Sequence, residues 1–445
     1  MYRVRRATKR VAMGNERSNV KNHKTQRKKK EETKRKARSN LKIVEQVECT
    51  IQEEKHEKKK KSQHAHLATN TKRAHSTPKE PLTLAMSPVT LRAKETEPLS
   101  CMSNRINVTP SNSNTTVRTA TEPGRETPPG ANGTPKTEKW CGEDAARAYI
   151  DKVDANNAKK EFYDLAQLPI DIDSKCITWK KNMKKNQSEM YPCFDANLIR
   201  NTANPDEYVN ATSVSVPQVS KNVIMAQFPK KGIDGSIEEF WKAIFQECVM
   251  LIHILTGSEE SIDFFPQTSG QYEHFGSMFV NNRKVEKIDT ESTMHLVEIL
   301  PTGFSNSNMC KIIIHNSWEE QNVPVKFSST IKSVIDVINF IATSLPDEKC
   351  AVISKHGAGR AGFFVALTSV VSSLNNKVEP RIYETVRSLR DQRPHAVDSL
   401  KQYTSLYLCL NYYIKKKIPE PAISARVQQI IDAFREMLTG ASVMQ

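Results

Sequence analysis

Hydrophobic residues recur over long stretches from about residue 140 onward, with the spacings that helices and strands require. Apolar side chains have helical spacing over residues 145–168, and Phe240, Trp241 and Phe245 gather on one side of a helix expected at 237–246. The other apolar runs predict strands at 223–227, 249–255, 311–315 and 351–353, and helices at 331–345, 363–373, 380–391, 400–413 and 423–438.

The order of these elements indicates the fold class. Strands with interspersed helices come first, and a cluster of helices ends the chain. This order predicts one α/β domain of the α+β type over residues 140–445, which is large but acceptable for a single unit.

The N-terminal third has a different composition. Residues 1–140 hold 32 Lys and Arg against 14 Asp and Glu, a net charge of +18, whereas residues 141–445 hold 34 against 36, a net charge of −2. Basic runs dominate residues 1–70, and residues 70–139 are rich in Ser, Thr, Asn and Pro. Such segments bury too little apolar surface to offset the entropy lost on ordering. We therefore predict a disordered, basic tail over residues 1–139.

The positive charge of residues 1–70 suggests two kinds of partner. One is nucleic acid, held by electrostatic contacts with its backbone and therefore released by salt. The other is an import receptor that recognises Lys- and Arg-rich stretches. A solvated charged tail with neither partner is the third interpretation.

Cysteine usage and hydropathy suggest the compartment. The nine cysteines are scattered without a C-x-x-C pair, so neither a zinc ribbon nor a disulfide framework is expected. The basic N-terminus has no apolar run after it, and no stretch approaches the ~20 apolar residues of a membrane span. We expect a protein of the cytoplasm, the nucleus or both, with no secretory signal, membrane span, metal or cofactor.

The segment Ala351-Val-Ile-Ser-Lys-His-Gly-Ala-Gly-Arg-Ala-Gly362 joins an apolar run to a glycine-rich loop and then to a second apolar run. This pattern predicts a strand, a tight loop and the start of a helix. Such a loop can direct several backbone N–H groups at one anion, which Arg360 can also bind through two hydrogen bonds. The alternative is that the glycines serve only the strand-to-helix turn.

Several stretches, taken in order, resemble those of the classical tyrosine-specific protein phosphatases, over nearly all of residues 145–438. Residues 354–360 resemble the family's Cys-x5-Arg signature, and 318–324 resemble its acid loop, Trp-Pro-Asp-x-x-Val-Pro. The resemblance implies a central mixed, twisted sheet flanked by helices. The other similar stretches are 185–195 (the phosphotyrosine loop), 208–211, 226–229, 239–241, and Gln392-Arg393 with Gln402-Tyr403 (the glutamine loop). The resemblance also implies a phosphate-binding loop made of Ser354, Lys355, His356, Gly357, Ala358, Gly359 and Arg360.

In this family a cysteine thiolate attacks phosphorus, an aspartic acid protonates the leaving phenol and a glutamine helps to place the water. Cysteine suits the attack because its pKa of ~8.5 is readily lowered by N–H dipoles and an arginine. This chain has Ser354 at the nucleophile position, and a serine needs an adjacent general base. His356 is close in sequence, but loop geometry favours an outward direction for its side chain. Cys350, about 13 Å away along a strand, is expected to be core packing.

Other positions of the chemistry depart from the family too. Glu320 stands at the acid position, and Glu319 replaces the proline before it. The longer side chain displaces the carboxyl group by roughly an ångström, and such a misplacement can cost ~100-fold in rate. Asp398 replaces the water-positioning glutamine, and its negative charge would repel a phosphate. Ile353 stands where the family has histidine, and Ala361 lacks the hydroxyl that follows the arginine.

The substrate-contacting positions have changed as well. Ser188 replaces the tyrosine that would wall in the substrate ring, and Met190 replaces the aspartate that would hold the peptide backbone. Gln402 matches the second glutamine of the family's last loop. Together these residues predict a catalytically inactive phosphatase-like domain that binds a protein partner in signalling, with or without phosphotyrosine. The alternative is an active tyrosine phosphatase with altered residues.

Overall fold

The computed structural model of the protein describes residues 140–320, 322–324 and 326–440. The predictions of a disordered tail over residues 1–139, and of its partners, lie outside the described residues. They remain predictions from the sequence, as does the domain boundary at residue 140.

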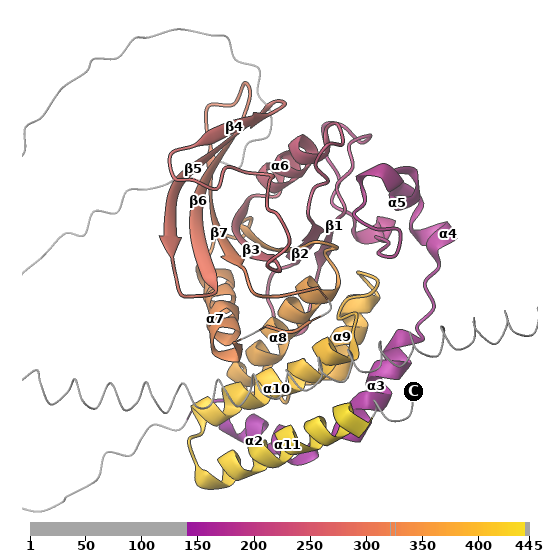
Figure 1. Cartoon of the computed structure of the whole chain (residues 1–445), viewed down its shortest axis with the longest axis vertical. Helices are drawn as coiled ribbons and strands as arrows, with labels where there is room; N and C mark the ends of the chain where they lie inside the picture. Colours follow the sequence, from indigo (N-terminus) through magenta and orange to yellow (C-terminus); the bar gives the residue numbers. More distant parts are fainter. Residues whose placement is uncertain (1–139, 321, 325, 441–445) are drawn as a thin grey trace, which may run out of the picture. The chain divides into compact units, whose positions relative to one another are not determined.

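Eight strands form one mixed sheet, which confirms the expected fold class (Figure 1). They are β1 (Ala211–Val214), β2 (Val223–Gln227), β3 (Val249–Leu255), β4 (Tyr272–Phe275), β5 (Met278–Lys287), β6 (Ser292–Pro301), β7 (Asn308–His315) and β8 (Lys349–Ser354). Their order across the sheet is β1-β2-β8-β3-β7-β6-β5-β4. Strands β2, β8, β3 and β7 are parallel, and the outer strands pair in antiparallel fashion.

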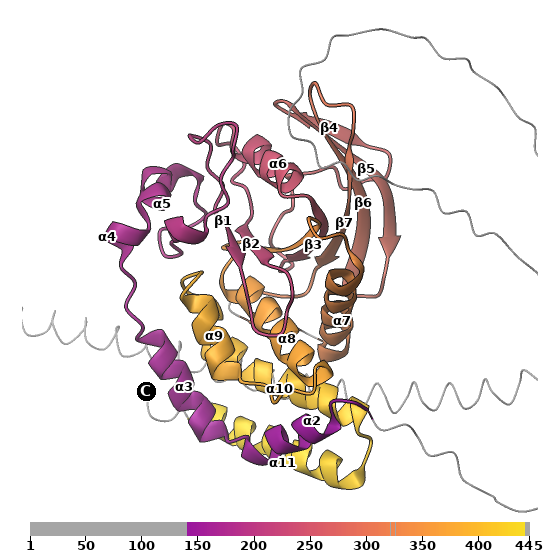
Figure 2. The same ribbon diagram turned by 180° about the vertical axis from the view of Figure 1, so that it is seen from behind.

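Helices cover both faces of this sheet (Figures 1 and 2). One face carries α6 (Ser236–Gln246), and the other carries the helices that end the chain. These are α7 (Phe327–Thr343), α8 (Gly359–Asn375), α9 (Ile382–Arg390), α10 (Leu400–Lys417) and α11 (Pro421–Gly440). Helices α2 (Glu143–Lys152) and α3 (Ala155–Ala166) pack in the same layer. The short helices α4 (Ile172–Lys175) and α5 (Ile177–Lys181) and the 3-10 helices η1 (Met183–Lys185) and η2 (Asp195–Asn197) precede β1. None of the helices described is both long and apolar enough to cross a bilayer.

Side-chain alternation along β8 fills both layers. Cys350 and Val352 belong to the core shared with α7, α8 and α10, whereas Ala351 and Ile353 belong to the core beneath α6. An uninterrupted apolar run is therefore the sequence of a strand buried on both faces. The expectation that Cys350 is core packing is confirmed, because the residue is 1% exposed and burial raises the pKa of its thiol.

The predicted strands and helices are confirmed, with ends that move by a few residues, but β1, β4, β5 and β6 were missed. Strand β4 is exposed or half-exposed at every position, and the second half of β5 is mostly polar and exposed, so neither has a clear period of two. The helix expected over 145–168 is two helices. The Asp154 side chain accepts a hydrogen bond from the Asn156 N–H and starts α3 afresh.

Two buried histidines on neighbouring strands make the fold sensitive to acid. His253 Nδ1 and His315 Nε2 lie 3.1 Å apart, and the ring of Phe364 on α8 packs against both imidazoles. Burial lowers the pKa of His315 to about 4, and burial beside His315 lowers the pKa of His253 well below its usual value. Below about pH 6.5 the unfolded chain therefore takes up protons that the folded domain does not.

We expect the free energy of unfolding to fall as the pH drops from about 7 to about 5, by about 2 kcal/mol from His315 alone. Urea unfolding across this range measures the loss. His315→Gln should flatten the pH profile, whereas His274→Gln, at an exposed position of β4, should leave it unchanged. An equal slope in both variants would contradict this origin of the acid sensitivity.

Candidate functional site

The loop of residues 354–360 joins the carboxyl end of β8 to the amino end of α8, as the sequence predicts. Ser354 ends the strand and is 2% exposed. The backbone reverses at Gly357, whose φ of +62° lies in the left-handed region. A Cβ atom at Gly357 would lie 2.3 Å from the carbonyl carbon of Ala226 on β2, so this position has no room for a side chain.

Arg393, a fully buried residue after α9, holds the loop from inside the protein. Its Nε donates to the carbonyl oxygen of Gly357 and its Nη2 donates to that of His356, each over 3.1 Å. Its Nη1 donates to Thr212 Oγ1 on β1, also over 3.1 Å. Two carbonyl groups of the loop are thereby fixed on the protein side, away from any ligand. Beyond the match of Gln392-Arg393, nothing in the sequence indicates this role.

Within the described residues, no base contacts the Ser354 hydroxyl. Ser354 Oγ accepts a hydrogen bond from the Gly357 N–H over 3.2 Å. The His356 ring makes no hydrogen bond to it: Nε2 lies 2.7 Å from Glu320 Oε1, and the buried Nδ1 has no hydrogen-bond partner. The side chain is 12% exposed and stacks on Tyr191, so it does not point outwards as the sequence predicts. The hydroxyl therefore lacks a group that could take its proton during an attack.

Arg360 has a carboxylate partner that the sequence reasoning missed. Its Nη1 and Nη2 each donate to a different oxygen of Glu260 over 2.7 Å, and Nη1 also donates to the carbonyl oxygen of Trp318. Arg360 is 3% exposed, so this is a nearly buried, bidentate ion pair. An anion in the loop would have to share the guanidinium with Glu260. The available signal was the run Gly257-Ser-Glu-Glu260 directly after β3.

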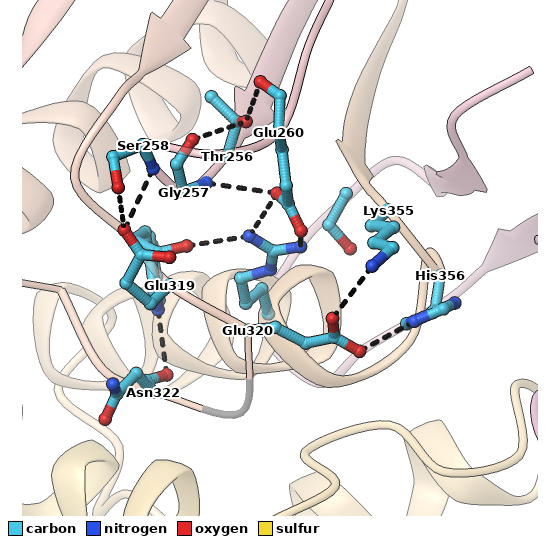
Figure 3. Close-up of polar contacts among 12 residues, drawn as sticks. Thr256, Gly257, Ser258, Glu260, Glu319, Glu320, Asn322, Lys355 and His356 are labelled. Atoms are coloured by element: carbon cyan, nitrogen blue, oxygen red, sulfur yellow. Dashed lines mark hydrogen bonds and ion pairs between the residues drawn. The ribbon is translucent and has the colours of Figure 1, made fainter. Parts of the chain in front are cut away.

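Glu320, from the acid loop of the resemblance, lies against Lys355 and His356 of the phosphate loop (Figure 3). Glu320 accepts a hydrogen bond from Lys355 Nζ over 3.1 Å and pairs with His356. Burial alone would raise the pKa of Glu320, but the hydrogen bonds and charges of Lys355 and His356 outweigh it and lower that pKa. Glu320 therefore stays ionised near neutral pH, and an ionised carboxylate cannot serve as a proton donor.

Glu319 anchors the acid loop from its other side (Figure 3). Its Oε1 accepts hydrogen bonds from the Ser258 N–H and Oγ over 2.9 and 2.8 Å, and these bonds lower the pKa of Glu319. The Trp318 N–H donates to the carbonyl oxygen of Thr256 over 3.0 Å in the same turn. Glu319, which stands where the family has proline, thus adds hydrogen bonds between the acid loop and the loop of Ser258.

Ser188 and Met190 lie in the phosphotyrosine loop and bond to each other. Ser188 Oγ accepts a hydrogen bond from the Met190 N–H over 3.1 Å, which closes a local turn, and Met190 is 74% exposed. The loop itself is well held, because Gln227 accepts from the Gln187 N–H and donates to the carbonyl oxygen of Lys185. The wall for a substrate ring is therefore missing because Ser188 replaces a tyrosine, and not because the backbone of the loop has changed.

Tyr191, from the same loop, lies beside the phosphate loop. Its ring stacks on the His356 ring with centroids 4.4 Å apart and an interplanar angle of 9°. Its hydroxyl donates to Asp398 Oδ2 over 2.8 Å. The sequence predicts no role for this tyrosine, because nothing local to residue 191 indicates a partner 207 positions away.

Asp398 is seated against the start of α8. A Cβ atom at Gly359 would lie 2.4 Å from Asp398 Oδ1, so the carboxyl group touches the phosphate loop itself. Burial raises the pKa of Asp398, against the hydrogen bond from Tyr191, which lowers it. The fully buried Gln402 accepts a hydrogen bond from the Asp398 N–H over 3.1 Å. Gln402 therefore supports the backbone of Asp398.

The structure thus brings Ser354, Glu320 and Asp398 to one place, around Lys355 and His356. The other predicted substrate positions, Ser188, Met190 and Gln402, have local or backbone partners instead. The site that results has an arginine cradle, a serine without a base, and two carboxyl groups against the loop.

The fold and this loop define a tyrosine phosphatase-like domain. The family model described as protein-tyrosine phosphatase matches residues 182–412, more than half of the chain. The chain belongs to the protein-tyrosine phosphatase family.

Curated relatives agree with this assignment. A Caenorhabditis elegans protein provisionally named a tyrosine-protein phosphatase is 29% identical over 288 residues, which cover 62% of this chain and 63% of that protein. Mouse receptor-type tyrosine-protein phosphatase alpha is 28% identical over 273 residues, which cover 58% of this chain and 32% of that protein. The chain thus matches less than two thirds of either relative's length.

Solved structures share the fold. The catalytic domain of human protein tyrosine phosphatase non-receptor type 18 superposes with a TM-score of 0.54 at 19% identity, covering 61% of this chain and all of that domain. A Trypanosoma cruzi protein tyrosine phosphatase gives a TM-score of 0.52 at 16% identity, covering 58% of this chain and 92% of that structure. At these identities the likeness concerns the fold alone.

Proposed function

We propose that this chain is a catalytically inactive member of its family that acts as a protein-binding module. The observation that carries the proposal is the Ser354 hydroxyl, which accepts a hydrogen bond from the loop and has no base beside it. An alcohol without a base is a far weaker nucleophile than the thiolate that this loop suits. The pairing of His356 with Glu320 and Tyr191 supports the same conclusion, because it turns the imidazole to other partners.

The charges around the loop support a loss of phosphate chemistry. Glu260 pairs with Arg360, Glu320 pairs with Lys355, and the Asp398 carboxyl group lies against the loop at Gly359. A helix amino end favours an anion by about 0.3–2 kcal/mol. A like charge at ~4 Å opposes it by about 1 kcal/mol in water and about 4 kcal/mol near a protein surface. A carboxylate at that distance would therefore offset the attraction of the helix for a phosphate dianion.

A protein partner remains the best-supported kind of ligand. Protein tyrosine phosphatase non-receptor type 18, which shares this fold, has been solved in complex with phosphorylated HER2 peptides. The exposed Met190, in the phosphotyrosine loop, replaces a residue that would hold a peptide backbone. We propose a partner bound on this face, with phosphotyrosine as an accessory contact at most.

The test is hydrolysis of phenyl phosphate by the full chain and by its Arg360→Ala variant. We expect equal rates, because Ser354 has no base to activate it and Glu320 is ionised and cannot donate a proton. A wild-type rate clearly above that of the variant would favour the alternative, an active phosphatase. Isothermal titration with a phosphotyrosyl peptide and with vanadate would then show separately whether the cradle holds an anion without turnover.

A further inference from the structure

A cavity of roughly 310 Å³ lies among α2, α3, the start of α9 and α10. None of its lining residues belongs to the phosphate loop or to the acid loop. Its volume falls at the small end of the roughly 300–1,000 Å³ typical of ligand sites, so an occupant would be a small molecule or one side chain.

Tyr149 gives this cavity an unmet polar group. The residue is 5% exposed and lines the cavity, and its buried hydroxyl has no hydrogen-bond partner. Burial, together with the nearby Glu161 carboxylate, raises the pKa of Tyr149 and keeps the hydroxyl neutral, with lone pairs free to accept a bond. Buried polar atoms are nearly always satisfied, so an unpaired hydroxyl on a residue that lines a cavity indicates a missing partner.

Glu161 supplies a fixed negative charge beside that hydroxyl. One carboxylate oxygen accepts hydrogen bonds from Tyr403 and Tyr407 over 2.7 and 2.5 Å, and the other accepts one from Asn157 over 2.7 Å. Three donors from two helices hold the carboxylate in one orientation. The group is therefore preorganised rather than a mobile surface charge.

The lining as a whole favours a cation. Lys152 and Glu379 neutralise each other at 2.7 Å, and Arg381 and Glu384 form a looser pair at 3.9 Å. Asp154 and Glu161 remain, so the lining has a net charge of −2. The rings of Tyr149, Tyr383 and Tyr407 also line the cavity, and aromatic faces attract cations.

We propose that this cavity binds a primary ammonium group, either on a small alkylamine or on a lysine side chain. The ammonium donates to the Tyr149 hydroxyl oxygen and is paired by the charge of Glu161 and Asp154. The aromatic rings pack against its alkyl stem. The proposal does not depend on the phosphate loop.

Isothermal titration of the full chain with 1,4-diaminobutane, n-butylamine and 1-butanol tests the proposal. We expect saturable binding of both amines and none of the alcohol, which has the same shape as butylamine without its charge. Glu161→Gln should weaken amine binding about 10-fold or more, because a charge-assisted bond becomes a neutral one. A short peptide with one lysine distinguishes the two sources: binding of the peptide but of neither free amine would assign the site to a protein partner.

Two variants keep the test independent of folding. Tyr149→Phe removes an unpaired buried hydroxyl, so the fold should be as stable or more stable while amine binding falls. Asp154→Asn keeps a good helix N-cap and removes only the charge. Arg360→Ala should leave amine binding unchanged, which separates this site from the proposed function. If no amine and no lysyl peptide binds the wild type, or if Glu161→Gln and Tyr149→Phe bind as well as it does, the proposal is overturned.

Discussion

Ser354→Cys alone should leave phenyl phosphate hydrolysis near background, whereas adding Glu320→Asp and Asp398→Gln should raise it by about 100-fold or more over the single variant. The cysteine would gain the N–H groups of the loop and the Arg360 charge, which favour a thiolate. Its reaction would still lack a placed acid, because Glu320 is ionised and tied to Lys355 and His356. The shorter aspartate draws the carboxyl group back from Lys355 and His356, which hold it ionised, and the neutral glutamine removes the negative charge beside the loop.

Phenyl phosphate is the informative substrate because its leaving group needs a proton, so the reaction reports on residue 320. The measurement is kcat/KM for wild type, single and triple variants, with Arg360→Ala added to the triple variant as control. That control should return to background. Full activity of Ser354→Cys by itself would contradict the account of Glu320 and Asp398, and would leave the nucleophile as the one defect.

Gly357→Ala should destabilise the domain by about 2–5 kcal/mol. A left-handed backbone costs a non-glycine residue about 1–2 kcal/mol, and crowding a packed interior typically costs about 1–3 kcal/mol more. The crowding here is severe, because the new Cβ would lie 2.3 Å from backbone atoms of β2 that the parallel sheet holds in place. Urea unfolding of the wild type and the variant measures the difference.

Gly303→Ala is the matched control. Gly303 also has a positive φ, +86°, but a Cβ atom there would meet nothing within 4 Å. Its variant should show the backbone cost alone, about 1–2 kcal/mol. Equal losses in the two variants would mean that contact with β2 contributes nothing at Gly357.

The sequence was informative where structure is local. The run from Ala351 to Gly362 specifies a strand, a turn and a helix within twelve residues, and each is present. Strands buried on both faces were found because their apolar runs are continuous. Strand β4 and the second half of β5 were not predicted, because their mostly exposed positions show neither a continuous apolar run nor a period of two.

The site was harder to foresee because its character depends on pairs of distant side chains. Glu260 lies 100 positions from Arg360, and Tyr191 lies 207 positions from Asp398. No periodicity connects such residues, and the family resemblance reveals only which positions differ. That Glu320 would be fastened to Lys355 and His356, rather than left as a mispositioned acid, follows from the folded loops alone.

Arg393 gives the loop a shape that owes nothing to a ligand. Because three hydrogen bonds from its guanidinium fix the loop to β1 and hold two loop carbonyls inward, the backbone is already ordered before anything binds. A ligand that binds despite the surrounding carboxylates would thus lose no binding free energy to ordering the loop. The proposed loss of catalysis is therefore compatible with a rigid receptor surface in one loop, since the proposal rests on residues 354, 320 and 398, and rigidity on Arg393.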